Sequence, residues 1–204
     1  MRSAADFYRI AAPENVLMKK PALFAVLPGI VAATLAIADP GGSTPSDSLR
    51  VVIIRHGEKP NTGDNLSCKG ENRALLLAEV LHQKFNVPDY LYVPSIGQKK
   101  SDSHARMFET IIPFAVKYGL KINSTFAVDA YSAAADQVLH KSGTVLMVWE
   151  HGAISALAEA LGVRPPPKWK GKDFDSIWII TYTGGKASLS IDREGIAPAA
   201  ECRY

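Results

Sequence analysis

The sequence predicts an α/β protein, a three-layer αβα sandwich with a mostly parallel sheet. Two observations predict this fold class. Apolar, β-rich stretches alternate with segments of helical periodicity after residue 49, and a Gly-Gly pair separates the last two extended stretches. Alternation of strands and helices indicates parallel strands covered by helices on both faces. A two-residue Gly-Gly connection is typical of a β-hairpin, so the C-terminal edge of the sheet is expected to be antiparallel.

The elements follow one another from Leu49 onwards. Strands are predicted at 50–55, 90–94, 144–150, 176–183 and 186–191. Helices are predicted at 71–86, 104–118, 130–141 and 153–162. The first helix shows the periodicity most clearly, because Ala74, Leu77 and Leu81 recur at steps of three and four residues. This apolar side is expected to pack on the sheet.

The N-terminal region 1–38 has the pattern of a secretory signal peptide. Met18 and two lysines precede an apolar run, which Pro28 and Gly29 interrupt and which ends in a small-x-small cleavage pattern. An interrupted run of this kind fits a cleaved signal better than a spanning helix. Residues 1–17 lack signal character, which favours Met18 as the true start of translation. The expected location is periplasmic or secreted, without stable membrane insertion after cleavage; the alternative is a membrane anchor formed by an uncleaved segment.

A Gly-, Pro- and Ser-rich stretch at 39–48 is interpreted as a linker, and the domain is expected to occupy 49–204. The chain has a formal net charge of +3, but four of its 23 basic residues lie in the first 38 positions. Scattered lysines without a basic stripe give no support for a nucleic-acid partner. The sequence leaves the oligomeric state open.

Cys68 and Cys202 are the only cysteines of the chain. An even pair in an exported protein indicates a disulfide that ties the loop after the first strand to the C-terminus. Two unlinked thiols are the alternative. The long separation of the two residues argues against a local metal-binding motif.

Polar side chains stand where two predicted strands end. Arg55 and His56 close the first strand, and His151 follows the strand at 144–150. Arg106 stands near the start of another helix, where its guanidinium and the helix dipole could hold an anion. Ligands of an open parallel sheet bind beyond the carboxyl ends of its strands. We therefore expect these two arginines and two histidines to enclose a tetrahedral oxyanion.

Three segments in this order resemble the histidine phosphatase (phosphoglycerate mutase-like) superfamily. They are Arg55-His56-Gly57-Glu58, Arg106-Met107-Phe108-Glu109-Thr110 and His151-Gly152. The resemblance extends from about Arg50 to the C-terminal hairpin. It implies phosphoryl transfer through a phosphohistidine on His56, with the phosphate oxygens held by Arg55, Arg106 and a protonated His151. The resemblance implies neither a cofactor nor a metal, and the partner it implies is a small phosphorylated substrate.

The general acid of such a reaction stays open. Some members of the superfamily carry an aspartate directly after the second histidine, where this chain has Gly152. Others carry a glutamate after the second arginine, but residues 121–141 contain only Asp129 and Asp136 as acidic residues. Glu58 and Glu150 are close to the motifs in sequence without matching these positions. Substrates with a good leaving group, such as an aryl phosphate or a phosphohistidine, are therefore favoured.

Other polar and aromatic residues are expected to be structural. Three histidines are assigned this way: His82, His104 and His140. Glu109 and Thr110 are expected to support the loop by hydrogen bonds rather than to touch substrate. Two lysines are expected in a solvated loop, although they could guide an anion: Lys99 and Lys100. Trp149 and Trp178 are predicted to be core residues, and Trp169 is predicted to line the substrate space.

The sequence thus predicts an exported phosphatase or phosphoesterase that hydrolyses a phosphomonoester or a phosphoramidate. A mutase is not expected, because the chain is too short for insertions that would enclose a bisphosphate. The alternative is a catalytically weak phosphate-binding or scaffold protein of the same fold.

Overall fold

The computed structural model describes residues 44–96 and 104–202. The predicted signal region 1–38 and the lysine pair Lys99 and Lys100 lie outside the described residues. Within the described ranges, no helix combines the length and the apolar character needed to cross a bilayer.

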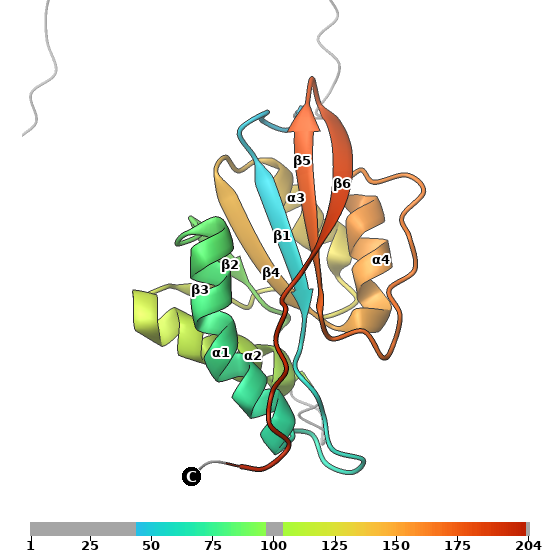
Figure 1. Cartoon of the computed structure of the whole chain (residues 1–204). Helices are drawn as coiled ribbons and strands as arrows, with labels where there is room; N and C mark the ends of the chain where they lie inside the picture. The colour runs from blue at the N-terminus through green and yellow to red at the C-terminus, as the bar shows by residue number, and fades with distance from the viewer. Residues whose placement is uncertain (1–43, 97–103, 203–204) are drawn as a thin grey trace, which may run out of the picture. The chain divides into compact units, whose positions relative to one another are not determined.

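One six-stranded sheet forms the centre of the domain, with the order β3-β2-β4-β1-β5-β6 (Figure 1). The strands are β1 (Arg50–Arg55), β2 (Tyr90–Tyr92), β3 (Ile122–Asn123), β4 (Thr144–Trp149), β5 (Ser176–Thr183) and β6 (Lys186–Arg193). The first four strands run parallel to one another, whereas β5 is antiparallel to both β1 and β6. The mostly parallel sheet and the antiparallel C-terminal edge are confirmed.

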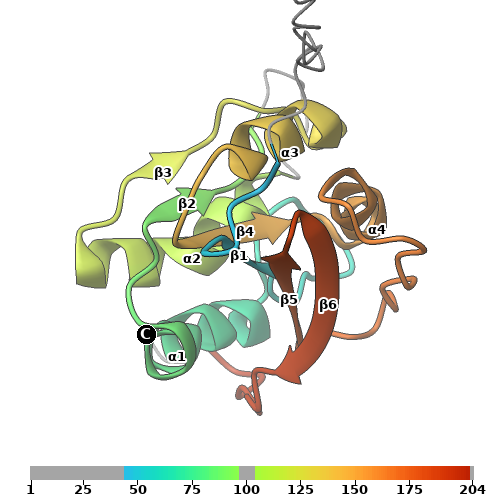
Figure 2. The ribbon, with the colours of Figure 1, turned by 90° about the horizontal axis from the view of Figure 1, so that it is seen from above.

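Helices cover both faces of this sheet (Figure 2). They are α1 (Cys68–Phe85), α2 (Ala105–Tyr118), α3 (Tyr131–Leu139) and α4 (His151–Ala160). Side chains alternate along β1, so Val52 and Ile54 pack with α1 and α2, while Val51 and Ile53 pack with α3 and α4. Each of these four residues is fully buried. The three-layer sandwich is confirmed.

The structure differs from the predicted elements mainly at their ends. Strand β3 was not predicted, because a strand of two residues is too short for a periodic pattern. Helix α1 begins at Cys68 rather than at 71, since the Ser67 hydroxyl accepts a hydrogen bond from the Gly70 amide at 3.2 Å. Helix α4 begins at His151 rather than at 153, because Glu150 caps it through its side chain.

The turn between β5 and β6 has the predicted hairpin geometry. Gly184 and Gly185 have φ angles of 55° and 76°, in the left-handed region that favours glycine. The Gly184 amide also donates to Asp47 Oδ1 at 2.8 Å. Asp47 lies within the predicted linker 39–48, so the C-terminal part of this stretch contacts the domain.

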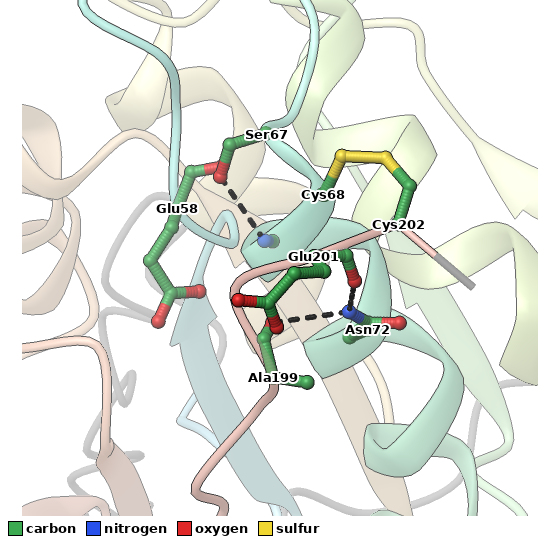
Figure 3. The surroundings of a disulfide bond; sticks show 8 residues. Glu58, Ser67, Cys68, Asn72, Ala199, Glu201 and Cys202 are labelled. Carbon is green, nitrogen blue, oxygen red and sulfur yellow. Dashed lines mark hydrogen bonds between the residues drawn. A yellow bond between two sulfur atoms is a disulfide. The ribbon is translucent and has the colours of Figure 1, made fainter.

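The C-terminal segment is fastened to the start of α1 (Figure 3). Cys68 and Cys202 form a disulfide, so the predicted bond is confirmed and the alternative of two unlinked thiols is wrong. The Asn72 amide donates to the carbonyls of Ala199 at 3.0 Å and Glu201 at 2.8 Å. The covalent bond and the two hydrogen bonds together hold the chain end against the N-terminal turn of α1.

Candidate active site

The tips of β1 and β4 bring the predicted residues together. These strands pair in parallel with Arg55 opposite Trp149, so His56 and His151 leave the sheet at neighbouring positions. Their ring centroids lie 6.0 Å apart with an interplanar angle of 74°. Arg55 and His56 are both buried, at 3% and 2% exposure. A rigid strand thus delivers a buried cationic group and an imidazole to one point.

His56 is held in a single orientation by its own loop. Its Nδ1 lies 2.7 Å from the backbone carbonyl of Gly57, and since the carbonyl can only accept, Nδ1 carries the proton. The Nε2 atom is then the unprotonated nitrogen. Burial lowers the pKa of His56 to about 4, more than the Gly57 hydrogen bond raises it, and the charges of Arg55 and Arg106 lower it further. The ring is therefore a neutral imidazole at neutral pH.

Arg55 is fixed by the loop that precedes β5. Its Nη1 donates to the carbonyls of Gly171 at 2.8 Å and Asp173 at 3.2 Å. Its Cζ lies 3.6 Å from the centroid of the Phe174 ring. Among the described residues, the Arg55 Nε is a buried polar side-chain atom without a hydrogen-bond partner. Burial lowers the pKa of Arg55 to about 10, which leaves it cationic at neutral pH.

His151 is paired with the residue before it. Its Nδ1 lies 2.7 Å from Glu150 Oε1 and 3.4 Å from Arg55 Nη2. A single Nδ1 cannot donate to Glu150 and accept from Arg55 at once, and the shorter contact favours the proton on Nδ1. Burial and the charges of Arg55 and Lys59 lower the pKa of His151, whereas Glu150 raises it. The protonated form that the sequence predicted is thus disfavoured in the ligand-free protein.

Arg106 lies at the start of α2 and contacts the loop that follows His56. Its guanidinium donates from Nη2 to the Gly63 carbonyl at 2.8 Å and from Nε to the Asn65 carbonyl at 3.4 Å. Its Nη2 also lies 3.8 Å from Asp64 Oδ1. The charge of Arg106 contributes to the lowered pKa of His56, so the two side chains lie within electrostatic range.

The support roles predicted for two residues of α2 are confirmed. The Thr110 hydroxyl accepts from the Gly57 amide at 2.8 Å and donates to the Arg106 carbonyl at 2.7 Å. Glu109 Oε2 accepts from the Leu66 amide at 2.7 Å. Through these bonds α2 holds the backbone on both sides of the loop that follows His56.

Two of the histidines assigned structural roles have structural contacts. His82 stacks on Tyr118 with 4.7 Å between ring centroids, and His140 Nδ1 lies 2.6 Å from the Asp136 carbonyl. His104 precedes α2 as its N-cap residue, without a capping hydrogen bond from its side chain.

The loop at 169–174 contains the functional residues that the sequence did not reveal. Trp149 and Trp178 are core residues as predicted, but the prediction that Trp169 lines the substrate space is wrong. Trp169 is only 4% exposed and packs on Trp178, because its indole Nε1 donates to the Asp173 carbonyl beneath the loop. Phe174 lies next to the site instead, 6.4 Å from the His56 ring centroid. The sequence feature that could have indicated this role is a phenylalanine, Phe174, in a loop rich in lysine.

Two carboxylates near the motifs have different partners. Glu58 is bound by Arg73 through two contacts, Nε to Oε2 at 2.8 Å and Nη2 to Oε1 at 2.9 Å. Glu150 is bound to His151, as described above. Asp129 and Asp136, the acidic residues between 121 and 141, are both exposed. Glu58 is therefore engaged, and among the carboxylates of residues 44–96 and 104–202 only Glu150 contacts a site imidazole.

The site also has the donor types of a cation site. In the described part of the chain, the ligand atoms of His56, Glu150 and His151 lie within 4.8 Å of one another. Arg55 lies against His151, however, and its positive charge opposes a divalent cation there. The two guanidiniums fit an anion better than a metal.

No family model matches the sequence, and no match is found among the curated proteins. Solved structures do share the fold. The histidine phosphatase SixA in complex with tungstate has a TM-score of 0.50 and 16% identity, covering 71% of this chain and 97% of its own. The mycobacterial glucosyl-3-phosphoglycerate phosphatase with inorganic phosphate also scores 0.50 at 16% identity, covering 74% and 97%. A protein assigned as an alpha-ribazole-5'-P phosphatase from Escherichia coli scores 0.51 at 14% identity, covering 72% and 96%.

These similarities extend over nearly the whole length of the matched structures. At such low identity they establish the fold rather than the activity. Together with the order of the elements, they show that the chain has a phosphoglycerate mutase-like α/β fold.

Proposed function

We propose that the protein is a phosphatase or phosphoesterase that acts through a covalent phosphohistidine on His56. The observation that carries this proposal is the protonation state of His56. The His56 side chain is a buried, neutral imidazole whose Nδ1 proton is donated to the Gly57 carbonyl, so Nε2 has a free lone pair. A neutral imidazole nitrogen is a competent nucleophile at neutral pH. The substrate is a phosphomonoester or a phosphoramidate, and His56 and its surrounding cations supply the chemistry without a cofactor or a metal.

The cations around His56 support a role in binding phosphate. Within the ranges that the structure describes, the buried Arg55 Nε has no hydrogen-bond partner, and a phosphate oxygen would complete its hydrogen bonding. In this proposal Arg106 and the His151 ring hold the other oxygens. Loss of one such preorganised donor typically costs about 100- to 1000-fold in rate. The tungstate and phosphate complexes of two proteins with this fold are consistent with a small phosphorylated substrate.

The test compares wild-type protein with His56→Ala on an aryl phosphate. We expect His56→Ala to abolish turnover and His140→Ala to leave it unchanged, because His140 is exposed and its Nδ1 contacts the Asp136 carbonyl of α3. Wild-type protein should also form a phosphoenzyme that is labile in acid and stable in alkali. Normal turnover by His56→Ala would exclude the covalent route.

A second candidate is a catalytically weak phosphate-binding or scaffold protein. The absence of a carboxylate at either acid position described for the superfamily favours it. Calorimetry with inorganic phosphate, combined with turnover assays over a broad pH range, separates the two candidates. Binding of phosphate without turnover of any aryl phosphate would favour the second candidate.

We also propose that the protein is exported to the periplasm or secreted after cleavage of residues 1–38. The Cys68–Cys202 disulfide supports this location, because disulfides persist in oxidising compartments. N-terminal sequencing of the protein from fractionated cells tests the proposal. Recovery of an uncleaved chain in the membrane fraction would favour the alternative of an N-terminal anchor.

A further inference from the structure

We propose that Glu150 orients His151 as the proton donor to the leaving oxygen, so that the Glu150–His151 pair fills the role of general acid. This inference rests on the proposed function of His56. It assigns Glu150 as a positioning residue, which acts on the reaction through the His151 ring.

The Glu150 carboxylate is held from two sides. Its Oε2 accepts from the Gly152 amide at 2.8 Å, and its Oε1 accepts from His151 Nδ1 at 2.7 Å. The first bond caps α4, so the backbone itself fixes the carboxylate. The second bond fixes the ring and leaves Nε2 as the nitrogen available to a substrate. A carboxylate that orients an imidazole in this way stabilises the imidazolium form.

The Nε2 of His151 lies close to Gly171. A Cβ at Gly171 would lie 3.7 Å from Nε2, and the Gly171 carbonyl binds Arg55. Nε2 therefore lies beside the loop that holds Arg55. The His151 ring also meets the His56 ring edge-on, at a centroid separation of 6.0 Å.

The other charges around His151 make Glu150 necessary for this role. Arg55 and Lys59 both disfavour a proton on the ring, and so does burial, whereas Glu150 favours it. His56 is neutral and contributes no negative charge. A bound phosphate dianion adds negative charge next to the ring. Glu150 and the substrate together would then overcome the two cations and protonate His151 in the complex.

The other carboxylates near the site are already engaged. Glu58 is bound by Arg73 through both of its oxygens. Asp173 Oδ2 accepts from the Ser176 hydroxyl at 2.6 Å, and its Oδ1 accepts from two backbone amides. Glu150 is thus the carboxylate whose bonding leads directly to an imidazole of the site.

The proposed hydrolysis has two steps, and atoms and protons balance over both. In the first step His56 Nε2 bonds to phosphorus, the bond from phosphorus to the leaving oxygen breaks, and that oxygen takes the proton from His151 Nε2. In the second step water attacks the phosphohistidine, His151 Nε2 takes a proton from that water, and the bond from phosphorus to His56 breaks. Inorganic phosphate leaves, and both rings return to their starting protonation states.

The test uses a series of phosphomonoesters whose leaving groups range from phenols to simple alcohols. We expect Glu150→Gln to lose about 100-fold in kcat/KM on alkyl phosphates, within the range of general acid catalysis. On an aryl phosphate with a good leaving group the loss should be only a few-fold, since a phenolate needs little protonation. The alkaline limb of the pH profile on alkyl phosphates should move to lower pH, because the carboxylate that raises the pKa of His151 is gone.

Glu150→Ser is the matched variant, since serine keeps a helix cap without the carboxylate. It should reproduce the selective loss, and Glu150→Asp should recover part of the alkyl activity. Asp136→Asn, at an exposed carboxylate on α3, should change none of these rates. A loss of equal size on aryl and alkyl substrates, or no loss at all, would overturn the assignment of Glu150. If wild-type protein forms no phosphohistidine, the proposed function itself fails, and this inference fails with it.

Discussion

Gly57 lies against Gly70, so closely that a Cβ on Gly57 would be 2.9 Å from the Gly70 carbonyl oxygen. The loop that carries His56 therefore packs directly on the first turn of α1. We expect Gly57→Ala to displace this loop and to destabilise the protein by about 1 to 3 kcal/mol, the usual cost of overpacking. Because Gly57 also supplies the acceptor for His56 Nδ1, turnover of an aryl phosphate should fall by more than the folded fraction does. Urea unfolding and kinetics on the same sample measure both effects, and unchanged kinetics would contradict this prediction.

Phe174 covers the Arg55 guanidinium at 3.6 Å. Phe174→Leu keeps an apolar side chain in place but removes the aromatic face. A cation–π contact is worth about 0.5 to 2 kcal/mol, so we expect the affinity for inorganic phosphate to fall by about 2- to 30-fold. Calorimetry with phosphate checks this result. An unchanged affinity would mean that the hydrogen bonds to the Gly171 and Asp173 carbonyls are enough to position Arg55.

The disulfide closes nearly the whole domain into a loop, since Cys68 and Cys202 are 134 residues apart. We expect the Cys68→Ser, Cys202→Ser double variant to lose about 2 to 4 kcal/mol of unfolding free energy. Wild-type protein in a reducing agent should lose a similar amount. The double variant should be insensitive to the reducing agent, which is the control for other effects of reduction.

Arg73 lies between the buried carboxylate of Glu194 and the partly buried carboxylate of Glu58. It binds Glu58 and also Glu194, whose Oε2 is 2.5 Å from Nη1. Burial raises the pKa of Glu194 to about 7 although Arg73 opposes this shift, so the carboxyl depends on its partner to stay ionised. We expect Arg73→Met to destabilise the protein by about 3 to 5 kcal/mol, since it leaves buried charges unpaired.

The control for this variant is Lys117→Met, which breaks the exposed pair with Glu79. Exposed ion pairs contribute little, so its unfolding midpoint in urea should stay close to that of wild type. Similar losses in the two variants would show that burial does not govern the Arg73 contact.

The lowered pKa of His56 predicts a pH dependence of stability. The pKa of a histidine is 6.5 in the unfolded chain and about 4 for His56 in the folded protein. Between these values the unfolded chain binds more protons, so this contribution to stability is complete above pH 6.5 and is lost as the pH falls toward 4. We expect wild-type protein to lose more unfolding free energy between pH 7 and pH 4.5 than His56→Ala does. Equal losses would mean that His56 titrates normally in the folded state.

Much of the fold could be predicted from the sequence, because the patterns that indicate it are local runs of residues or pairs of residues of one kind. The run 51–54 is apolar on both faces, as a central strand must be, and His56 and His151 each follow such a strand. The carboxyl ends of parallel strands share one edge, so both imidazoles were expected at one place. The disulfide was predicted from the even pair of cysteines and the expected export.

Other features could not be predicted, because they depend on which loops meet in space. Arg73 contacts Glu58 and Glu194 across 15 and 121 residues, and no periodicity indicates such a pair. Trp169 is directed inward and Phe174 toward Arg55 because the carbonyls of their loop bind the Arg55 guanidinium. The sequence by itself determined the sheet and the helices, and it predicted which four residues form the site. Only the tertiary structure decided the proton on each imidazole, since that depends on burial and on the particular carbonyl or carboxylate that each ring meets.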